Sequence, residues 1–227
     1  MKTFIKITTV LLAVLGFLII VIYWFEAEKE VRILCSMFQK GQSVEDVQRT
    51  LDTGNLLSYR KDPEEISVHS IYTLNSTECT VRLSDEATVT ESVYRQYIRL
   101  EGVAGGFAAV LTFGLSVFQL LLALGVPWGE WAWGGFHKKL PRSLRIWSFI
   151  SFLLLIIAGF SVLSSTDFID LIPQNISRII VSLLTIIFLG SIVGNFNSQS
   201  AKERKVMIPL SIFLLCSYLV VVVYLLG

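Results

Sequence analysis

Long uninterrupted runs of hydrophobic residues, rather than short periodic patterns, dominate this chain. A bilayer core about 30 Å thick requires roughly 20 apolar residues in a helix that crosses it. Five stretches without charged residues come close to this length or exceed it: 7–25, 102–129, 146–166, 179–201 and 206–227. We therefore predict an all-α membrane bundle of five transmembrane helices, the first within residues 1–25 and the others at about 102–126, 146–166, 179–197 and 206–226.

The segment that follows the first run has a mixed apolar and polar pattern. Apolar side chains at three- and four-residue spacing predict a helix over residues 26–40. No glycine or proline lies between Gly16 and Gly41, so the first span should continue into this helix without a break and end at Gly41. A second, short helix should follow Ser43, which is spaced from Asp46 as in an N-cap pair.

Beyond the two helices the apolar residues alternate with polar ones, which is typical of strands. We predict strands at 66–74, 79–83 and 87–94, separated by the turn signals Lys61-Asp62-Pro63, Asn75-Ser76 and Ser84-Asp85. Residues 26–101 should therefore form a small α+β domain of two helices on a three- or four-stranded antiparallel sheet. Residues 102–227 should form a four-helix membrane domain.

Charge divides the chain in the same way. Only 16% of the residues are charged, against about 25% in soluble domains, and 23 of the 37 charged residues lie within 26–101. The net charge of +1 does not indicate a basic nucleic-acid binder, so we expect no nucleic-acid partner.

Basic residues indicate the orientation, because they collect in cytoplasmic loops. If the spans alternate, one side holds Lys2, Lys6, Lys138, Lys139, Arg142, Arg145, Lys202, Arg204 and Lys205, whereas the opposite short loop holds Arg178 alone. We predict a cytoplasmic N-terminus, with residues 26–101 and the C-terminus outside. The first run ends in Ile22-Tyr23-Trp24-Phe25, without the small residues of a cleavage site, so we interpret it as a signal anchor rather than a cleaved signal peptide.

The three cysteines differ in predicted location. Cys35 and Cys79 both fall in the predicted extracytoplasmic domain, where a small core is often stabilised by a disulfide, and Cys216 falls in the fifth span. We predict a Cys35–Cys79 disulfide; the alternative is two buried thiols that serve as small apolar side chains.

No set of residues indicates catalysis. The two histidines, His69 and His137, are predicted on opposite sides of the membrane, and no phosphate-binding loop, zinc-ligand spacing or nucleophile motif occurs. We therefore expect no catalytic residue, no metal, no cofactor and no enzymatic activity.

The predicted spans contain no charged side chains and few polar ones. We assign helix packing to Gln119, as an interhelical hydrogen-bonding group, and to the G-x-x-x-G pairs Gly102–Gly106 and Gly190–Gly194, since glycine lets helices approach closely. Packing within the chain and packing between two copies both remain open.

The loop after the second span interleaves tryptophans with glycines and then becomes basic. Its candidate residues are Trp128, Trp131, Trp133, His137, Lys138, Lys139, Arg142 and Arg145. The pattern fits a segment in the inner headgroup layer near anionic lipid. It serves either as a simple interfacial anchor or as a docking surface for a lipid or a protein partner.

The run Pro127-Trp128-Gly129, Ala132-Trp133-Gly134-Gly135, Leu140-Pro141 and Leu144-Arg145, followed by further spans, resembles an uncharacterised family of small bacterial multi-pass membrane proteins. The resemblance covers about residues 105–227. It implies a bacterial cytoplasmic-membrane protein and implies no reaction. The segment 41–47 with the following strands is similar to the small domains of bacterial outer-membrane assembly lipoproteins; no lipid-attachment cysteine follows the first run, so the lipoprotein role is not carried over.

Together these features predict a polytopic membrane protein with an accessory, sensing or scaffolding role in the cell envelope. Membrane lipids, an envelope protein and a second copy of the chain are its expected partners. The alternative is a component of an oligomeric transporter or channel.

Overall fold

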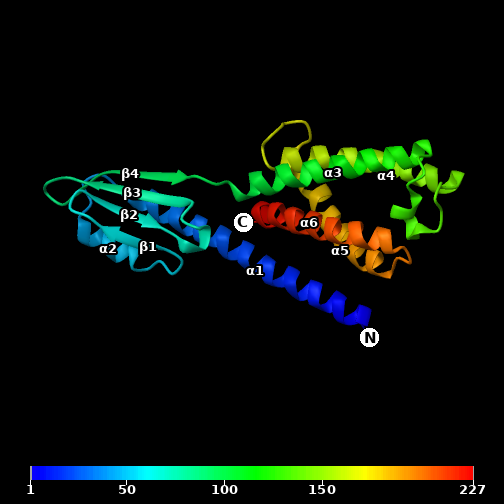
Figure 1. The fold of residues 1–227 in the computed structure, drawn as a ribbon. Coiled ribbons are helices and arrows are strands. Elements are labelled where there is room, and N and C mark those ends of the chain that lie inside the picture. Colours follow the sequence, from blue (N-terminus) through cyan, green and yellow to red (C-terminus); the bar gives the residue numbers. More distant parts are fainter. Residues whose placement is uncertain (1, 227) are drawn as a thin grey trace. The chain divides into compact units, whose positions relative to one another are not determined.

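The computed structural model describes residues 2–226, without the side chains of Lys2, Thr3 and Lys6, two of which contribute to the predicted orientation. Five long apolar helices and a four-stranded antiparallel sheet with a short helix make up the chain, as predicted (Figure 1). Residues 19–99 form one compact unit, called here the sheet domain. Residues 100–226 contain the four helices of the other unit, called here the helical bundle.

Helix α1 (Lys2–Met37) is a single helix of 36 residues, so the predicted first span and the helix after it are continuous. At 1.5 Å per residue it is about 54 Å long, well beyond the roughly 30 Å of a bilayer core. The helix ends at Met37, before the predicted stop at Gly41. Gly41 instead lies in the following turn with a φ of 87°, and its N–H donates to the carbonyl of Val89 at 2.8 Å.

The short helix α2 (Val44–Leu51) begins where its cap was predicted. The Ser43 hydroxyl accepts from the Asp46 N–H at 3.2 Å and donates to the Asp46 carboxylate at 2.8 Å. These two bonds satisfy a backbone donor at the start of the helix and fix its first turn.

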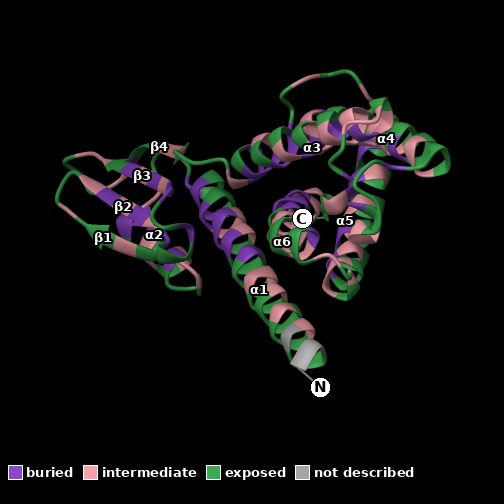
Figure 2. Ribbon diagram, turned by 45° about the vertical axis from the view of Figure 1, so that its right-hand side comes forward, coloured by how far each residue is buried: buried purple, intermediate pink, exposed green. Residues whose placement is uncertain are grey.

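The sheet consists of β1 (Ser58–Lys61), β2 (Glu65–His69), β3 (Thr77–Leu83) and β4 (Val89–Gln96), in that order and antiparallel throughout. Its register places Val68 opposite Cys79 and Ile66 opposite Val81. These side chains are buried on the face that packs against α1 and α2, and Figure 2 shows burial along the C-terminal half of α1. The core consists of Val31, Leu34, Cys35, Phe38, Val44, Val47, Leu51, Ile66, Val68, Cys79, Val81 and Val89.

The predicted disulfide is present in this core. Cys35 on α1 and Cys79 on β3 are bonded, with their Cα atoms 5.8 Å apart. The bond therefore links α1 directly to β3, an inner strand of the sheet. Cys216 is the free cysteine among the described residues.

The predicted strand over 66–74 is wrong in its second half. β2 ends at His69, and the Ser70 hydroxyl then donates to the carbonyl of Leu56 and accepts from the N–H of Tyr72. These local bonds start a 3₁₀ turn at Ile71–Thr73, which replaces the ladder that the alternation predicted. The fourth strand is β1, which no sequence pattern had indicated, and Ala87 lies in a turn with a φ of 54° instead of opening β4.

In the helical bundle, α3 (Leu100–Leu124) packs against α4 (Arg142–Ser165) and α6 (Ala201–Leu226), while α5 (Gln174–Asn197) packs against α4 and α6. Small side chains occupy most of the buried positions of α3 and α4. They include Gly105, Ala108, Ala109, Thr112 and Ser116 on α3 and Ala158, Gly159, Ser161 and Ser165 on α4. Without a hydrophobic force between helices in lipid, close packing of small residues provides much of the association.

Polar contacts join α6 to α3 and to α5. The hydroxyls of Thr112 and Tyr218 lie 3.2 Å apart between α3 and α6. The Asn195 amide on α5 donates to the carbonyl of Met207 and to the Ser211 hydroxyl on α6, each at 3.2 Å. Pro209 lies inside α6, whose start at Ala201 precedes the predicted start of this span by five residues.

Candidate functional site at the loop end of the bundle

Residues 125–141, called here the Trp loop, connect α3 to α4 and fold into an ordered cap. The chain leaves α3 through Gly125, at a φ of 93°, and makes two 3₁₀ turns at Gly129–Trp131 and Trp133–Gly135. The Gly129 N–H donates to the carbonyl of Lys138 at 3.0 Å, which closes the loop on itself. A Cβ at Gly129 would collide with the carbonyl of His137, so this approach requires glycine.

The three predicted tryptophans of the loop occupy different positions. Trp128 stacks on Phe118 of α3, with ring centroids 6.4 Å apart and planes 13° apart. The Trp133 indole N–H donates to the Ser148 hydroxyl of α4 at 2.9 Å. Two of the rings are therefore fixed against the bundle by specific contacts, while all three remain partly exposed.

The Trp loop also contacts the turn between α5 and α6. The Ser200 hydroxyl donates to the carbonyl of Glu130 at 2.6 Å, and Lys202 forms an ion pair with the Glu130 carboxylate. Lys202 lowers the pKa of Glu130 through this hydrogen bond and charge. The two connections predicted to share one side of the membrane thus lie at one end of the bundle.

This end carries the predicted cations. His137, Lys138, Lys139 and Arg142 are exposed, and Arg145 is partly buried because its Nε donates to the Ala123 carbonyl at the end of α3, at 2.8 Å. Arg145 thus completes the C-terminus of a helix, where a cation is electrostatically favourable. The other four side chains lie at the surface, where lipid headgroups or a partner can reach them.

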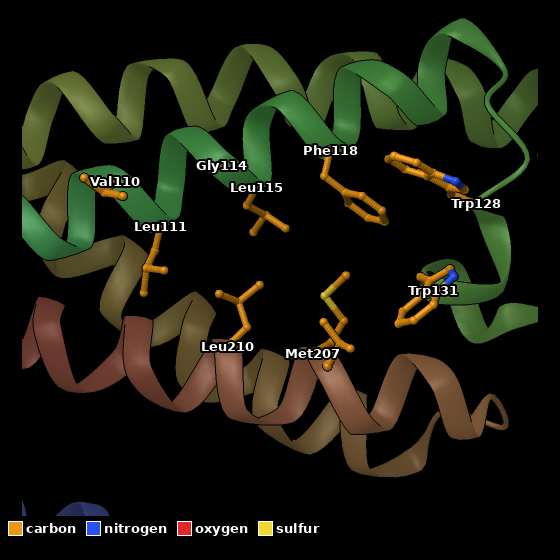
Figure 3. A pocket seen from close by; sticks show the side chains of 10 residues that line it. Val110, Leu111, Gly114, Leu115, Phe118, Trp128, Trp131, Met207 and Leu210 are labelled. Atoms are coloured by element: carbon orange, nitrogen blue, oxygen red, sulfur yellow. The ribbon is translucent and has the colours of Figure 1, made fainter.

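An apolar groove of about 750 Å³ runs along α3 and α6, and its lining is shown in Figure 3. Trp128 and Trp131 line the end of the groove next to the Trp loop, beside Phe118 and Met207. The remaining lining residues are Val110, Leu111, Gly114, Leu115, Val206 and Leu210. The groove therefore presents an apolar surface, and the indole rings of Trp128 and Trp131 lie at the end formed by the Trp loop.

A second space, called here the polar cavity after its polar side chains, is lined by α3, α4, α5, α6 and the Trp loop and has a volume of about 270 Å³; it is partly open, and most of its wall is apolar. Its polar lining comprises Gln119, Ser151, Ser191, Asn195, Glu203 and Ser211, and its remaining walls include Ala132 and Trp133 of the Trp loop. Gln119 lines this cavity, and its side-chain oxygen is buried without a hydrogen-bond partner among the described residues. The interhelical hydrogen bond predicted for the Gln119 side chain therefore stays a prediction.

Glu203 was missed as a site residue because it stands among three cations in a short connection. In the structure it belongs to the first turn of α6, is only 6% exposed, and accepts from the Ser198 hydroxyl. The signal in the sequence is the spacing of Glu203, Met207, Ser211 and Leu214, which places the carboxylate on the inward stripe of α6.

The glycines assigned to helix packing have different surroundings. A Cβ at Gly106 would lie 3.9 Å from Phe168, and Gly102 is buried. The closest approach on α3 is instead at Gly105, where a Cβ would lie 2.6 Å from the Thr166 side chain. A Cβ at Gly190 or Gly194 would meet nothing within 4 Å, so no neighbour in the described chain approaches them and packing against a second copy stays a prediction.

Among the described residues, no group of three or more His, Cys, Asp or Glu side chains could hold a metal ion. His69 is half-buried on β2, and His137 is exposed in the Trp loop. No family model matches this chain, and neither a curated protein nor a solved structure matches it.

Proposed function

We propose that this multi-pass membrane protein has an accessory role in the bacterial cytoplasmic membrane, as a sensor or scaffold. In this proposal the sheet domain faces the extracytoplasmic side and binds a second envelope component. The Trp loop and its cations contact anionic lipid or a partner at the inner surface. The bacterial location in this proposal rests on the resemblance of the Trp loop, and the orientation rests on the positive-inside rule.

The observation that supports this role best is the continuity of α1. The same helix provides an apolar span and, with Val31, Leu34 and Cys35, a large part of the domain core. No flexible linker separates the apolar run from the domain core, because one uninterrupted helix contributes to both. In this proposal, binding at the domain is transmitted to the span through that helix, as sensing or scaffolding requires.

The binding surface that we propose is the sheet face away from the helices. Thr80 and Ser67 are paired across β2 and β3 on this face and are half-buried, and Arg82 is exposed and bonded to Glu91 on β4 at 3.0 Å. The face is polar, rigid and supported by the disulfide-linked core. Such a surface suits a specific protein contact better than catalysis, for which it offers no pocket among those described.

Site-specific photocrosslinking in intact membranes tests the proposal. A photoreactive residue at Thr80 should give one discrete adduct with a partner that copurifies in a fixed ratio. The same residue at Val81, which is fully buried on the opposite face, should give none. Equal labelling from both positions, or no adduct from any position of the outer face, would contradict the proposal.

The alternative, an oligomeric transporter or channel component, is favoured by the polar cavity alone. A polar space inside a membrane bundle is expensive unless it has a use. Solute or ion flux from the purified protein in liposomes, lost on Glu203→Gln, would replace the proposed role with this one.

A further inference from the structure

We propose that the polar cavity binds a small protonated amine, with the Glu203 carboxylate as its counter-ion. This inference does not depend on the interaction role proposed above, because the cavity lies within the bundle. Its size alone limits the ligand. Its volume of about 270 Å³ lies just below the roughly 300–1,000 Å³ of pockets that hold drug-sized ligands, so the ligand must be small.

Three polar side chains of the cavity have their hydrogens engaged within the protein and keep free acceptors. The Ser191 hydroxyl donates to the carbonyl of Phe188 at 2.8 Å, and the Ser211 hydroxyl donates to that of Met207 at 2.6 Å. The Asn195 amide nitrogen is likewise engaged, by Met207 and Ser211. These side chains therefore offer lone pairs to a ligand and have few hydrogens left to give.

Two further groups add acceptors. The oxygen of Gln119 has no hydrogen-bond partner among the described residues, and an unsatisfied buried acceptor is costly. Glu203 is only 6% exposed, and the Ser198 hydroxyl donates to its carboxylate. An ammonium group carries one positive charge and three donors, which matches a carboxylate surrounded by neutral acceptors.

The rest of the lining specifies the other part of the ligand. Part of the cavity wall is apolar and is formed by Leu115, Phe188 and Leu214. Glu203 is the one charged residue of the lining. An alkyl chain of a few carbons would cover this wall, whereas an inorganic cation would leave it in contact with water. The lining therefore favours an alkylammonium over potassium or sodium.

Trp133 provides the measurement, because it lines the cavity and is fixed by its bond to Ser148. Tryptophan emission of the full-length protein in nanodiscs is titrated with n-butylammonium chloride at constant ionic strength. The expected result is a saturable change that potassium chloride, butyrate and n-butanol do not reproduce. An equal response to potassium chloride, or a response to butyrate or n-butanol, would overturn the proposal.

Variants assign the response to the cavity. Glu203→Gln should weaken butylammonium binding at least tenfold, since a charge-assisted contact is lost. The control is Glu130→Gln, which lies at the same end of the bundle but outside the cavity. This variant should bind butylammonium with unchanged affinity. If Glu203→Gln does not fold, Ser191→Leu should abolish the saturable change by filling the space while the melting temperature is kept. If Glu203→Gln binds butylammonium as well as the unmodified protein does, Glu203 is only a helix-terminal carboxylate and the proposal is contradicted. Unweakened binding by Ser191→Leu would contradict the location of the site in the cavity.

Discussion

The sheet domain and the helical bundle bury different kinds of side chains. The domain places Val, Leu, Ile and Phe side chains in one core and adds a disulfide at its centre. In the bundle, many of the buried positions are Gly, Ala, Ser and Thr, while large apolar residues such as Val110, Ile186 and Phe213 are exposed. The bundle also buries large side chains such as Leu122 and Tyr218, but small and hydroxyl side chains make up a much larger share of its buried positions than of the domain core.

The difference follows from the solvent of each region. In water, an apolar side chain gains about 25 cal/mol per Å² when it is buried, so the domain hides its large side chains. In lipid this gain disappears, so helices associate through close packing and hydrogen bonds. Such packing leaves room for polar spaces, and the polar cavity occurs in the bundle rather than in the domain. The side chains that each region buries therefore indicate whether water or lipid surrounds it.

The largest expected effect comes from removing the disulfide. For a sequence separation of 44, the chain-entropy relation gives about 4 kcal/mol of stabilisation. Cys35→Ser or Cys79→Ser should therefore make the sheet domain of the full-length protein sensitive to protease at much lower urea, while the bundle stays protected. Cys216→Ser is the control, and an equal loss in that variant would show that the effect is not local to the domain.

The next effect should come from enlarging a glycine in the bundle. A Cβ at Gly159 would lie 2.6 Å from the Phe113 ring, and overpacking of this kind typically costs about 1–3 kcal/mol. Gly159→Ala should lower the melting temperature in detergent, and Gly105→Ala should do the same through Thr166. Gly190→Ala, which meets no neighbour, should leave the monomer unchanged; similar losses at all three positions would refute the packing described here.

A smaller effect is expected at the junction of α1 with the domain. The two carboxylate oxygens of Glu30 accept from the N–H groups of Asn55 and Leu56, at 2.9 and 2.7 Å. Glu30→Ala should cost about 2 kcal/mol, because two charge-assisted bonds to the backbone are lost. Hydrogen exchange at Asn55 and Leu56 measures the loss, and Glu26→Ala, an exposed position on the same helix, should not change it.

The smallest effect should come from the ion pair of Lys202 and Glu130, which is largely exposed. Lys202 lowers the pKa of Glu130 in the folded protein, so any stabilisation is present above the ordinary carboxyl pKa and is lost as the pH falls through the lowered value. Lys202→Met should remove this acid dependence and leave the melting temperature near pH 7 almost unchanged. A large loss near pH 7 would mean that the pair fixes the Trp loop.

Global features were predictable because they depend on long patterns. Runs without charge located the five spans, and the absence of glycine and proline between Gly16 and Gly41 predicted the continuous α1. The predicted helix starts were late by four or five residues at α4, α5 and α6, because each helix begins in the polar or charged residues that precede its apolar run.

Local features were harder because single side-chain bonds decide them. Ser70 ends β2 within an alternating pattern, and β1 (Ser-Tyr-Arg-Lys) is largely exposed and carries no apolar alternation. Glu203 belongs to an inward stripe that is visible only once the start of α6 is known. The candidate cavity therefore could not be assembled from the sequence, although Gln119 stood out within it.

Topology mapping tests the central claim most directly, namely that the sheet domain and the Trp loop lie on opposite sides of a membrane. Alkaline phosphatase, which is active only outside the cytoplasm, is fused after residues 60, 138, 170 and 203. The account predicts activity at residues 60 and 170 and none at residues 138 and 203. A cytoplasmic signal at residue 60 would contradict it.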